Sequence, residues 1–292
     1  MSSTTSNEDY YVPHGTYWPI IGSIGLSLTV VGIANFLHGT WSATPIFVGL
    51  AVIIFMMYGW FGTVVDESLA GLYNKQVDMS FRWGMGWFIF SEVMFFAAFF
   101  GALFYARVYS IPWLDGASNN DATAQYLWPD FEAAWPLLSV PLADKYSEAK
   151  QAMGAWGLPA INTAVLLTSG LTVTLAHWAL KRKDKVWLVY WLFATVALGF
   201  GFVFLQAYEY SHAYQDLNLR LDSGIYGSTF YLLTGFHGFH VTMGATMLLI
   251  IMIRAAKSHF TPENHFAFEA VAWYWHFVDV VWLGLFVFVY WI

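Results

Sequence analysis

Seven long apolar segments constrain the fold of this chain more than any other feature of its sequence. Each is long enough for an α-helix to cross the hydrocarbon core of a bilayer, which takes about 20 residues. With 58% hydrophobic and only 11% charged residues, the chain cannot be an ordinary soluble domain. The alternation over about ten residues that is typical of membrane β-barrel strands is absent. We therefore predict an all-α membrane protein whose spans are Trp18–Leu37, Pro45–Val64, Trp83–Ala106, Gly157–Leu180, Val186–Tyr208, Ser228–Ile253 and Phe268–Ile292.

The residues between the spans indicate the topology. We predict one integral membrane domain, residues 1–292, with two helices in 1–65, an inner loop at 66–81 and five helices in 82–292, where 111–156 is a long outer loop. If the N-terminus is cytoplasmic, eight of the 12 Lys and Arg residues lie inside, which the positive-inside rule favours. We therefore predict an N-inside and C-outside orientation. The inner residues are Lys75, Arg82, Lys181, Arg182, Lys183, Lys185, Arg254 and Lys257, and the outer ones are Arg107, Lys145, Lys150 and Arg220.

The outer loop is acidic, with two lysines against Asp115, Asp121, Asp130, Glu132, Asp144 and Glu148. A solvated acidic surface is the favoured interpretation, and the alternative is a surface that attracts a basic soluble partner. The chain has no cysteine, which excludes thiolate metal sites, disulfides and c-type haem attachment. It also lacks a Walker loop, a dinucleotide fingerprint and a nucleophile elbow, so we expect no catalytic centre of its own.

Glu92 is the most informative polar residue, because it lies near the middle of the third span. A carboxyl group at that depth must be protonated or bonded to a donor, since charged groups near the bilayer centre cost about 2.5–3.5 kcal/mol on insertion scales. We expect a hydrogen bond across the bundle to His240 or His237. A structural hydrogen bond is slightly favoured over a role in lipid, proton or oxygen handling.

His237 and His240 lie three apart on the sixth span, a spacing that also suits metal ligation. A metal would need further ligands, for which Glu92 and His276 are candidates, but the flanking residues are glycine and phenylalanine. Hydrogen-bonded core histidines are therefore the better interpretation. His276 and Asp279 likewise share one face of the last span.

Other polar residues lie near the ends of the spans. Glu209 is close to the outer end of the fifth span. At the inner interface, cations can hold lipid phosphates as well as orient helices, so a lipid-binding and a structural role are equally favoured there. The residues in question at or near that interface are Trp60, Glu67, Arg82, Arg254, Lys257, His259 and His265.

Several blocks of the sequence resemble subunit III of the cytochrome c oxidases, and together they are highly specific. The resemblance covers most of the chain from Tyr17 onward. The blocks are Phe81-Arg-Trp-Gly-Met, Ser91-Glu-Val-Met-Phe-Phe, Leu205–Tyr210, Gly224–Phe230, Thr234-Gly-Phe-His-Gly-Phe-His-Val, His265-Phe-Ala-Phe-Glu-Ala and Trp273–Trp282.

This resemblance implies a seven-helix subunit in which a V-shaped cleft between a two-helix and a five-helix bundle holds phospholipids. It implies direct packing against oxidase subunit I, with subunit II in the same complex and cytochrome c as the electron donor. Haem a and copper would reside in the partner subunits, with no cofactor in this chain except bound phospholipid. Nucleic acid is not an expected partner.

The resemblance also carries over to single residues. Glu92 matches the family's intramembrane carboxylate. Six interface residues match polar positions around inner lipid headgroups: Glu67, Arg82, Arg254, Lys257, His259 and His265. Asp66 is a departure, because relatives can carry a basic residue nearby. The loop 111–156 is longer than in mitochondrial forms, which favours a bacterial plasma membrane.

We therefore expect a non-redox accessory subunit of a proton-pumping terminal oxidase in aerobic respiration, which stabilises the catalytic subunit, binds phospholipid and supports oxygen or proton access. One alternative is an ion-coupled transporter that uses Glu92, His240 and Asp279. It predicts discontinuous helices and an inverted repeat, which the sequence does not show. A second alternative is a free-standing metalloenzyme, whereas the oxidase interpretation predicts no metal site in this chain.

Overall fold

A computed structural model describes residues 11–12, 15–139 and 145–292, and its regular elements are all helical. Within these residues, seven helices are long and apolar enough to cross a membrane, which confirms the predicted class. They are α1 (Trp18–Leu37), α2 (Thr44–Leu69), α3 (Lys75–Tyr105), α5 (Leu158–Lys181), α6 (Lys185–Gln215), α7 (Gly224–Ala256) and α8 (Phe266–Leu285). The shorter elements are α4 (Ile111–Leu114) and the π-helical segments η1 (Ala106–Ser110), η2 (Thr123–Leu127) and η3 (Phe286–Trp291).

Several helices continue past the predicted ends of the spans. The inner loop predicted at 66–81 is the clearest correction, because α2 ends at Leu69 and α3 already begins at Lys75. The charged residues there end the apolar run but not the helix, since their side chains reach water while the backbone hydrogen bonds continue. Asn74 caps α3, because its Oδ1 accepts hydrogen bonds from the backbone N–H groups of Gln76 (3.1 Å) and Val77 (2.9 Å).

The chain folds as two compact units, Met1–Trp83 and Gly84–Ile292, with the boundary inside α3. In the first unit, α1 and α2 pack as a pair through small residues. A Cβ on Gly49 would overlap Thr29 Oγ1, and a Cβ on Gly25 would lie 2.9 Å from Ile53 Cγ1. Such small surfaces let helices approach closely in lipid, where van der Waals packing drives association.

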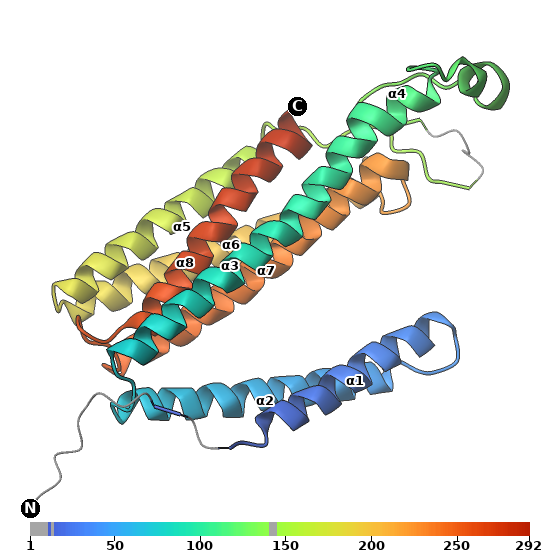
Figure 1. Ribbon diagram of the computed structural model, residues 1–292. Helices are drawn as coiled ribbons and strands as arrows, with labels where there is room; N and C mark the ends of the chain where they lie inside the picture. The colour runs from blue at the N-terminus through green and yellow to red at the C-terminus, as the bar shows by residue number, and fades with distance from the viewer. Residues whose placement is uncertain (1–10, 13–14, 140–144) are drawn as a thin grey trace, which may run out of the picture. The chain divides into compact units, whose positions relative to one another are not determined.

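In the second unit, α5, α6, α7, α8 and the remainder of α3 lie side by side (Figure 1). Its core is built around two fully buried tryptophans of α8, whose indole N–H groups reach α5. Trp275 Nε1 donates to Ser169 Oγ at 2.9 Å, and Trp282 Nε1 donates to Thr163 Oγ1 at 2.8 Å. These bonds satisfy the polar end of each ring inside an otherwise apolar bundle.

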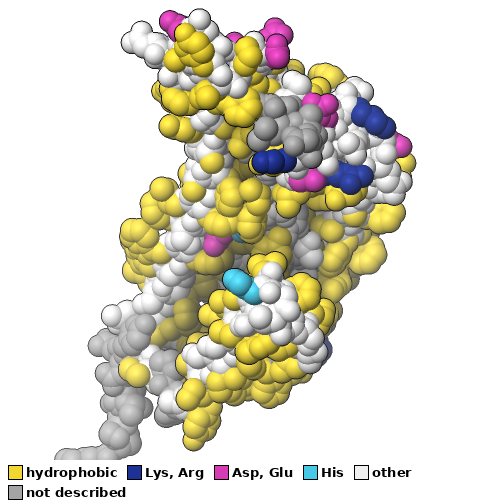
Figure 2. Space-filling model, turned by 90° about the vertical axis from the view of Figure 1, so that its right-hand side faces the viewer, with side chains coloured by type: hydrophobic (Ala, Val, Ile, Leu, Met, Phe, Trp, Pro, Cys, Tyr) yellow, Lys and Arg dark blue, Asp and Glu magenta, His cyan; other side chains and the backbone are white. Residues whose placement is uncertain are grey.

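The outward surfaces of the spanning helices are strongly apolar. Large hydrophobic side chains such as Phe204 on α6 (72% exposed) and Ile161 on α5 (57%) point away from the core. Figure 2 shows one face of the molecule, where hydrophobic side chains dominate and most charged ones gather toward the top, near α4 and the long loop. Apolar surface of this extent suits contact with lipid. One acidic residue of that loop, Asp144, lies outside the described residues.

The α5–α6 turn and the α7–α8 loop lie at the same end of the second unit (Figure 1). We call it the basic end, and its cations are Lys181, Arg182, Lys183, Lys185, Arg254 and Lys257. An exposed ion pair of 4.0 Å, Lys183 Nζ to Glu263 Oε1, joins the turn to the loop. The basic end is the one predicted to face the cytoplasm.

Candidate functional site

Glu92 and His240 form a hydrogen bond between α3 and α7, as the sequence predicts. Glu92 Oε2 lies 2.8 Å from His240 Nε2, and the side chains are 22% and 9% exposed. The other ring nitrogen, His240 Nδ1, lies 2.6 Å from the carbonyl oxygen of Phe236 one turn earlier. The pair is therefore bonded on both sides of the imidazole ring.

These contacts determine how many protons the pair holds. A carbonyl oxygen only accepts, so His240 Nδ1 carries a hydrogen and donates it to Phe236. One more proton must lie between His240 Nε2 and Glu92 Oε2, either on the carboxyl group or on the ring. In both forms the pair has zero net charge, which suits its position within a membrane span.

Aromatic rings surround this pair and limit its contact with water. The His240 ring centroid lies 5.0 Å from that of Phe96 and 5.8 Å from those of Phe95 and Phe239. Tyr274 of α8 stacks on the imidazole at 6.4 Å, and its hydroxyl donates to the backbone oxygen of His240 at 3.3 Å. An apolar surrounding strengthens a satisfied polar pair and makes the loss of either partner costly.

His237 lies apart from this pair. It is completely buried, and its Nε2 atom lies 3.0 Å from the carbonyl oxygen of Val278 on α8. Because a carbonyl oxygen only accepts, Nε2 donates this hydrogen bond. Its ring packs against Trp282 (5.0 Å) and Phe202 (5.5 Å). Because His237 and His240 bond different partners, the described contacts support core histidines rather than a shared metal site on α7.

Asp279 is buried against α5, while His276 on the same helix is exposed. Asp279 Oδ2 lies 3.6 Å from His276 Nδ1, and a Cβ on Gly170 of α5 would overlap Asp279 Oδ2. Thr174 Oγ1 lies 3.4 Å from His276 Nε2. Asp279 therefore has different neighbours from Glu92 and His240, so the three residues of the transporter alternative do not form one cluster.

Glu209 and Asp279 are the two buried acids among the described residues, and Glu209 is only 1% exposed. Tyr290 of η3 donates its hydroxyl hydrogen to Glu209 Oε1 at 2.7 Å, whereas Oε2 has no hydrogen-bond partner within the described chain. Two neighbours of Glu209 on α6 bind Thr234 of α7. Tyr210 bonds the Thr234 hydroxyl at 2.7 Å, and Gln206 donates to the Thr234 backbone oxygen at 2.8 Å. These contacts join α6 to α7 and to the C-terminal segment.

Three basic groups gather where α7 ends. The Arg254 guanidinium lies 4.7 Å over the Phe260 ring, and its buried Nε has no hydrogen-bond partner among the described residues. The same holds for Nδ1 of the half-buried His259. Desolvation, followed by the charges of Arg254 and Lys257, lowers the pKa of His259 below its usual value of 6.5, so this ring is neutral at pH 7. The end of α7 therefore combines positive charge with a buried N–H donor, Arg254 Nε, that has no described partner.

In the first unit, the predicted interface residues have protein partners of their own. Both oxygens of Glu67 accept hydrogen bonds, from Tyr11 at 3.0 Å and from Tyr73 at 2.7 Å. Arg82 forms an ion pair with Asp78 at 2.7 Å. Trp60 is 42% exposed on α2, where its ring is available to lipid.

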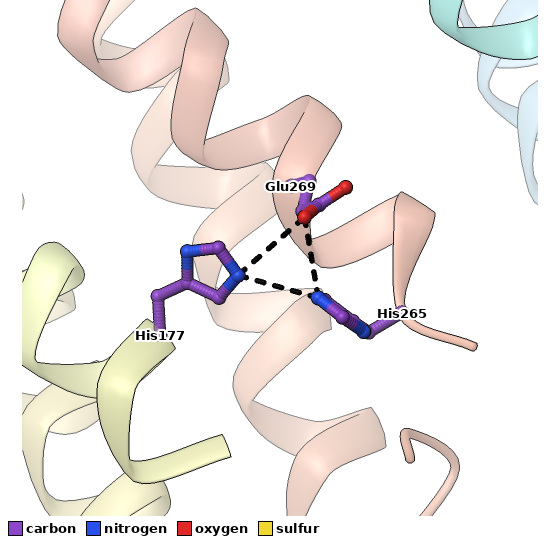
Figure 3. A group of neighbouring side chains, drawn as sticks. All are labelled: His177, His265 and Glu269. Carbon is purple, nitrogen blue, oxygen red and sulfur yellow. Dashed lines mark hydrogen bonds and ion pairs between the residues drawn. The ribbon is translucent and has the colours of Figure 1, made fainter. Parts of the chain in front are cut away.

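His265, the last of the predicted interface residues, belongs to a cluster that the sequence analysis missed. It lies with His177 of α5 and Glu269 of α8 at the basic end, and Figure 3 shows the three side chains converging. The spacing of four residues between His265 and Glu269 was a usable signal, because it places both on one face of a helix. His177 gave none, since it is 88 residues from His265 in sequence.

Comparison with known proteins gives a consistent picture. A model of the family described as cytochrome c oxidase subunit III matches residues 8–117 and 133–292. Cytochrome c oxidase subunit 3 of Drosophila yakuba is 38% identical, covering 99% of this chain and 98% of the relative. The corresponding proteins of Marchantia polymorpha (39% identical, 99% and 98% covered) and Gadus morhua (37%, 97% and 96%) are similar to the same extent. Residues 118–132, within the acidic loop, fall outside the family match.

Proposed function

The chain belongs to the family of cytochrome c oxidase subunit III, and we propose that it is the non-redox accessory subunit of a proton-pumping cytochrome c oxidase. As a multi-pass membrane protein of this family, it assembles with other oxidase subunits. In the proposal it packs directly against subunit I, with subunit II in the same complex and cytochrome c as donor. Haem a and copper belong to the partner subunits.

The Glu92–His240 contact is the observation that best supports an accessory role. Both groups are bonded to each other, and both ring nitrogens of His240 have partners, so the histidine offers no free nitrogen to a haem or copper. The bond instead ties α3 to α7 inside the bundle. An interhelical bond of this kind stabilises a scaffold against which a catalytic subunit can pack.

Removal of the subunit tests this role. Detergent extraction of this chain from the purified oxidase should leave haem and copper content and the initial rate of cytochrome c oxidation almost unchanged. Proton uptake and the duration of turnover should decline. Loss of haem or copper together with the chain would contradict the proposal.

We further propose that the basic end binds a phospholipid headgroup. Arg254 and Lys257 supply positive charge, the buried Arg254 Nε supplies an N–H donor without a described partner, and the neutral His259 ring lies beside them, which suits a phosphate oxygen. Exposed apolar rings such as Trp60 would contact acyl chains, and Glu67 and Arg82 would belong to the inner interface of the first unit.

Lipid analysis of the purified complex tests this site. Arg254→Gln should lower the amount of tightly bound anionic phospholipid. Arg182→Gln is the matched control, since it removes the same charge from an exposed position at the same end. Equal losses in the two variants would indicate a general charge effect and would contradict a specific site.

A proton-related role of Glu92 is a separate proposal. The Glu92–His240 pair holds one shared proton at zero net charge, so it can change which atom carries the proton without creating net charge in the membrane. Glu92→Gln would remove this exchange while keeping a hydrogen bond. Proton uptake by the variant oxidase should then slow at unchanged haem content. Unaltered uptake would leave Glu92 with a structural role only.

We also propose a bacterial plasma membrane as the location. The support is the acidic loop, whose residues 118–132 have no counterpart in the family match. Membrane fractionation of the source cells with an antibody against the chain tests this location. Recovery in mitochondria would contradict it.

A further inference from the structure

We propose that His177, His265 and Glu269 form a binding site for one divalent transition-metal ion, with Zn²⁺ as the reference ion. His177 lies one turn before the end of α5, His265 precedes the first residue of α8, and Glu269 lies in the first turn of α8. The site goes beyond the proposed accessory function. It also departs from the prediction that this chain has no metal ligands.

The distances between the three ligand atoms match tetrahedral coordination. His177 Nε2 lies 3.3 Å from His265 Nε2 and 3.6 Å from Glu269 Oε1, and His265 Nε2 lies 3.2 Å from Glu269 Oε1. Zinc bonds of about 2.0–2.1 Å at tetrahedral angles separate ligand atoms by about 3.3–3.4 Å. Octahedral coordination at the same bond length would require about 2.9 Å. The observed spacing therefore suits Zn²⁺ better than Mg²⁺.

The hydrogen bonding of His265 orients it as a ligand. Its Nδ1 atom lies 3.0 Å from the carbonyl oxygen of Thr261, which can only accept, so Nδ1 carries the hydrogen. In the neutral ring, Nε2 then directs its lone pair toward His177 and Glu269 (Figure 3). A backbone carbonyl that holds the second nitrogen of a histidine is the usual support of a metal-bound imidazole.

The same contacts bring lone pairs together at the centre of the cluster. With the His265 hydrogen on Nδ1, His265 Nε2 and a Glu269 carboxylate are two acceptors 3.2 Å apart. His177 Nε2 can supply a single hydrogen to them. A cation at the centre would instead satisfy all three lone pairs at once. An additional proton would also do so, and the experiment below separates these cases.

The position of the cluster allows an ion to enter and leave a coordination site open. The His177, His265 and Glu269 side chains are 23%, 9% and 14% exposed, so the cluster is shielded but not closed. Two imidazoles and one carboxylate, with water in the fourth position, form a donor set that zinc accepts. The bound ion would connect the ends of α5 and α8. We assign no redox step to it.

Zinc titration of the intact purified oxidase tests the site. After treatment with a chelator, zinc retained per complex is measured by mass spectrometry for the wild type, His177→Gln and Glu269→Gln. Each variant should retain one zinc ion fewer than the wild type, or bind it at least about 10-fold more weakly. Because partner subunits can also bind zinc, the site is judged from the difference in zinc retained per complex between the wild type and each variant.

His212→Gln is the matched control. His212 Nδ1 lies 2.6 Å from Asp216 Oδ2 with the same four-residue spacing as His265 and Glu269, but it belongs to no three-ligand group among the described residues. Its substitution should leave zinc stoichiometry unchanged. A loss equal to that in His177→Gln would overturn the site.

X-ray absorption at the zinc edge provides a measurement that does not depend on the variants. The spectrum of the zinc-loaded Glu269→Gln variant is subtracted from that of the zinc-loaded wild type. The difference spectrum should show nitrogen and oxygen ligands at about 2.0–2.1 Å, with the outer-shell scattering that imidazole rings produce. Equal zinc binding in wild type and both ligand variants would show a proton-bonded cluster instead. Because haem content and electron transfer are unaffected in either case, failure of the site leaves the accessory function standing.

Discussion

The Glu92–His240 bond yields a quantitative prediction. Glu92→Leu leaves His240 Nε2 without a partner among the rings of Phe95, Phe96 and Tyr274, while Nδ1 remains bonded to Phe236. One buried unsatisfied polar group costs about 1–3 kcal/mol. A difference of about 1.4 kcal/mol changes an equilibrium constant tenfold. The equilibrium constant for retention of the folded subunit should therefore decrease by about 5-fold to 150-fold.

Glu92→Gln should cost much less, because its amide N–H can donate to His240 Nε2 and the side chain has a similar volume. In the double variant Glu92→Leu/His240→Phe both partners are removed, so its cost should be smaller than the sum of the single costs. The assay is thermal loss of the subunit from the oxidase in lipid nanodiscs. Equal effects of Gln and Leu, or strict additivity in the double variant, would refute the reasoning.

Three other substitutions test the packing of the second unit, each by thermal unfolding against a matched control. Gly170→Ala should destabilise by about 1–3 kcal/mol because its Cβ meets Asp279 Oδ2, whereas Gly201→Ala, with no described atom within 4 Å of its Cβ, should be neutral or stabilising. Trp282→Phe should cost about 1–3 kcal/mol through the lost bond to Thr163 and the cavity left behind, and the exposed Trp187→Phe should cost almost nothing. Tyr290→Phe should cost about 1–3 kcal/mol because Glu209 Oε1 loses its donor, with the exposed Tyr208→Phe as control. Equal effects in any of these pairs would contradict the corresponding contact.

Much of the fold could be predicted from the sequence because the bilayer imposes a simple rule on apolar length. The predicted and observed bounds of α1 are both Trp18–Leu37. Where a helix extends into the interface, as α3 does from Lys75, hydropathy ends before the helix does. The partner of Glu92 could be narrowed to two histidines because a carboxyl group at mid-membrane depth requires a nearby donor.

The remainder depends on helix rotation and on contacts between distant segments. His237 and His240 are three residues apart, yet one bonds α8 through Val278 and the other bonds Glu92 of α3. No local pattern distinguishes them, because the angle at which α7 faces each neighbour is set by packing. The cluster of His177 with His265 was missed for the same reason, since α5 and α8 meet only in the folded bundle.

The most direct test of the central claim is affinity purification of this chain from its native membrane in mild detergent, followed by haem and copper analysis. The accessory-subunit account predicts that haem a and copper co-purify with the chain, together with cytochrome c oxidase activity. It also predicts that both remain with the partner subunits when this chain is then stripped away. Purification of the chain without a haem–copper partner, or haem that follows the stripped chain, would contradict the account.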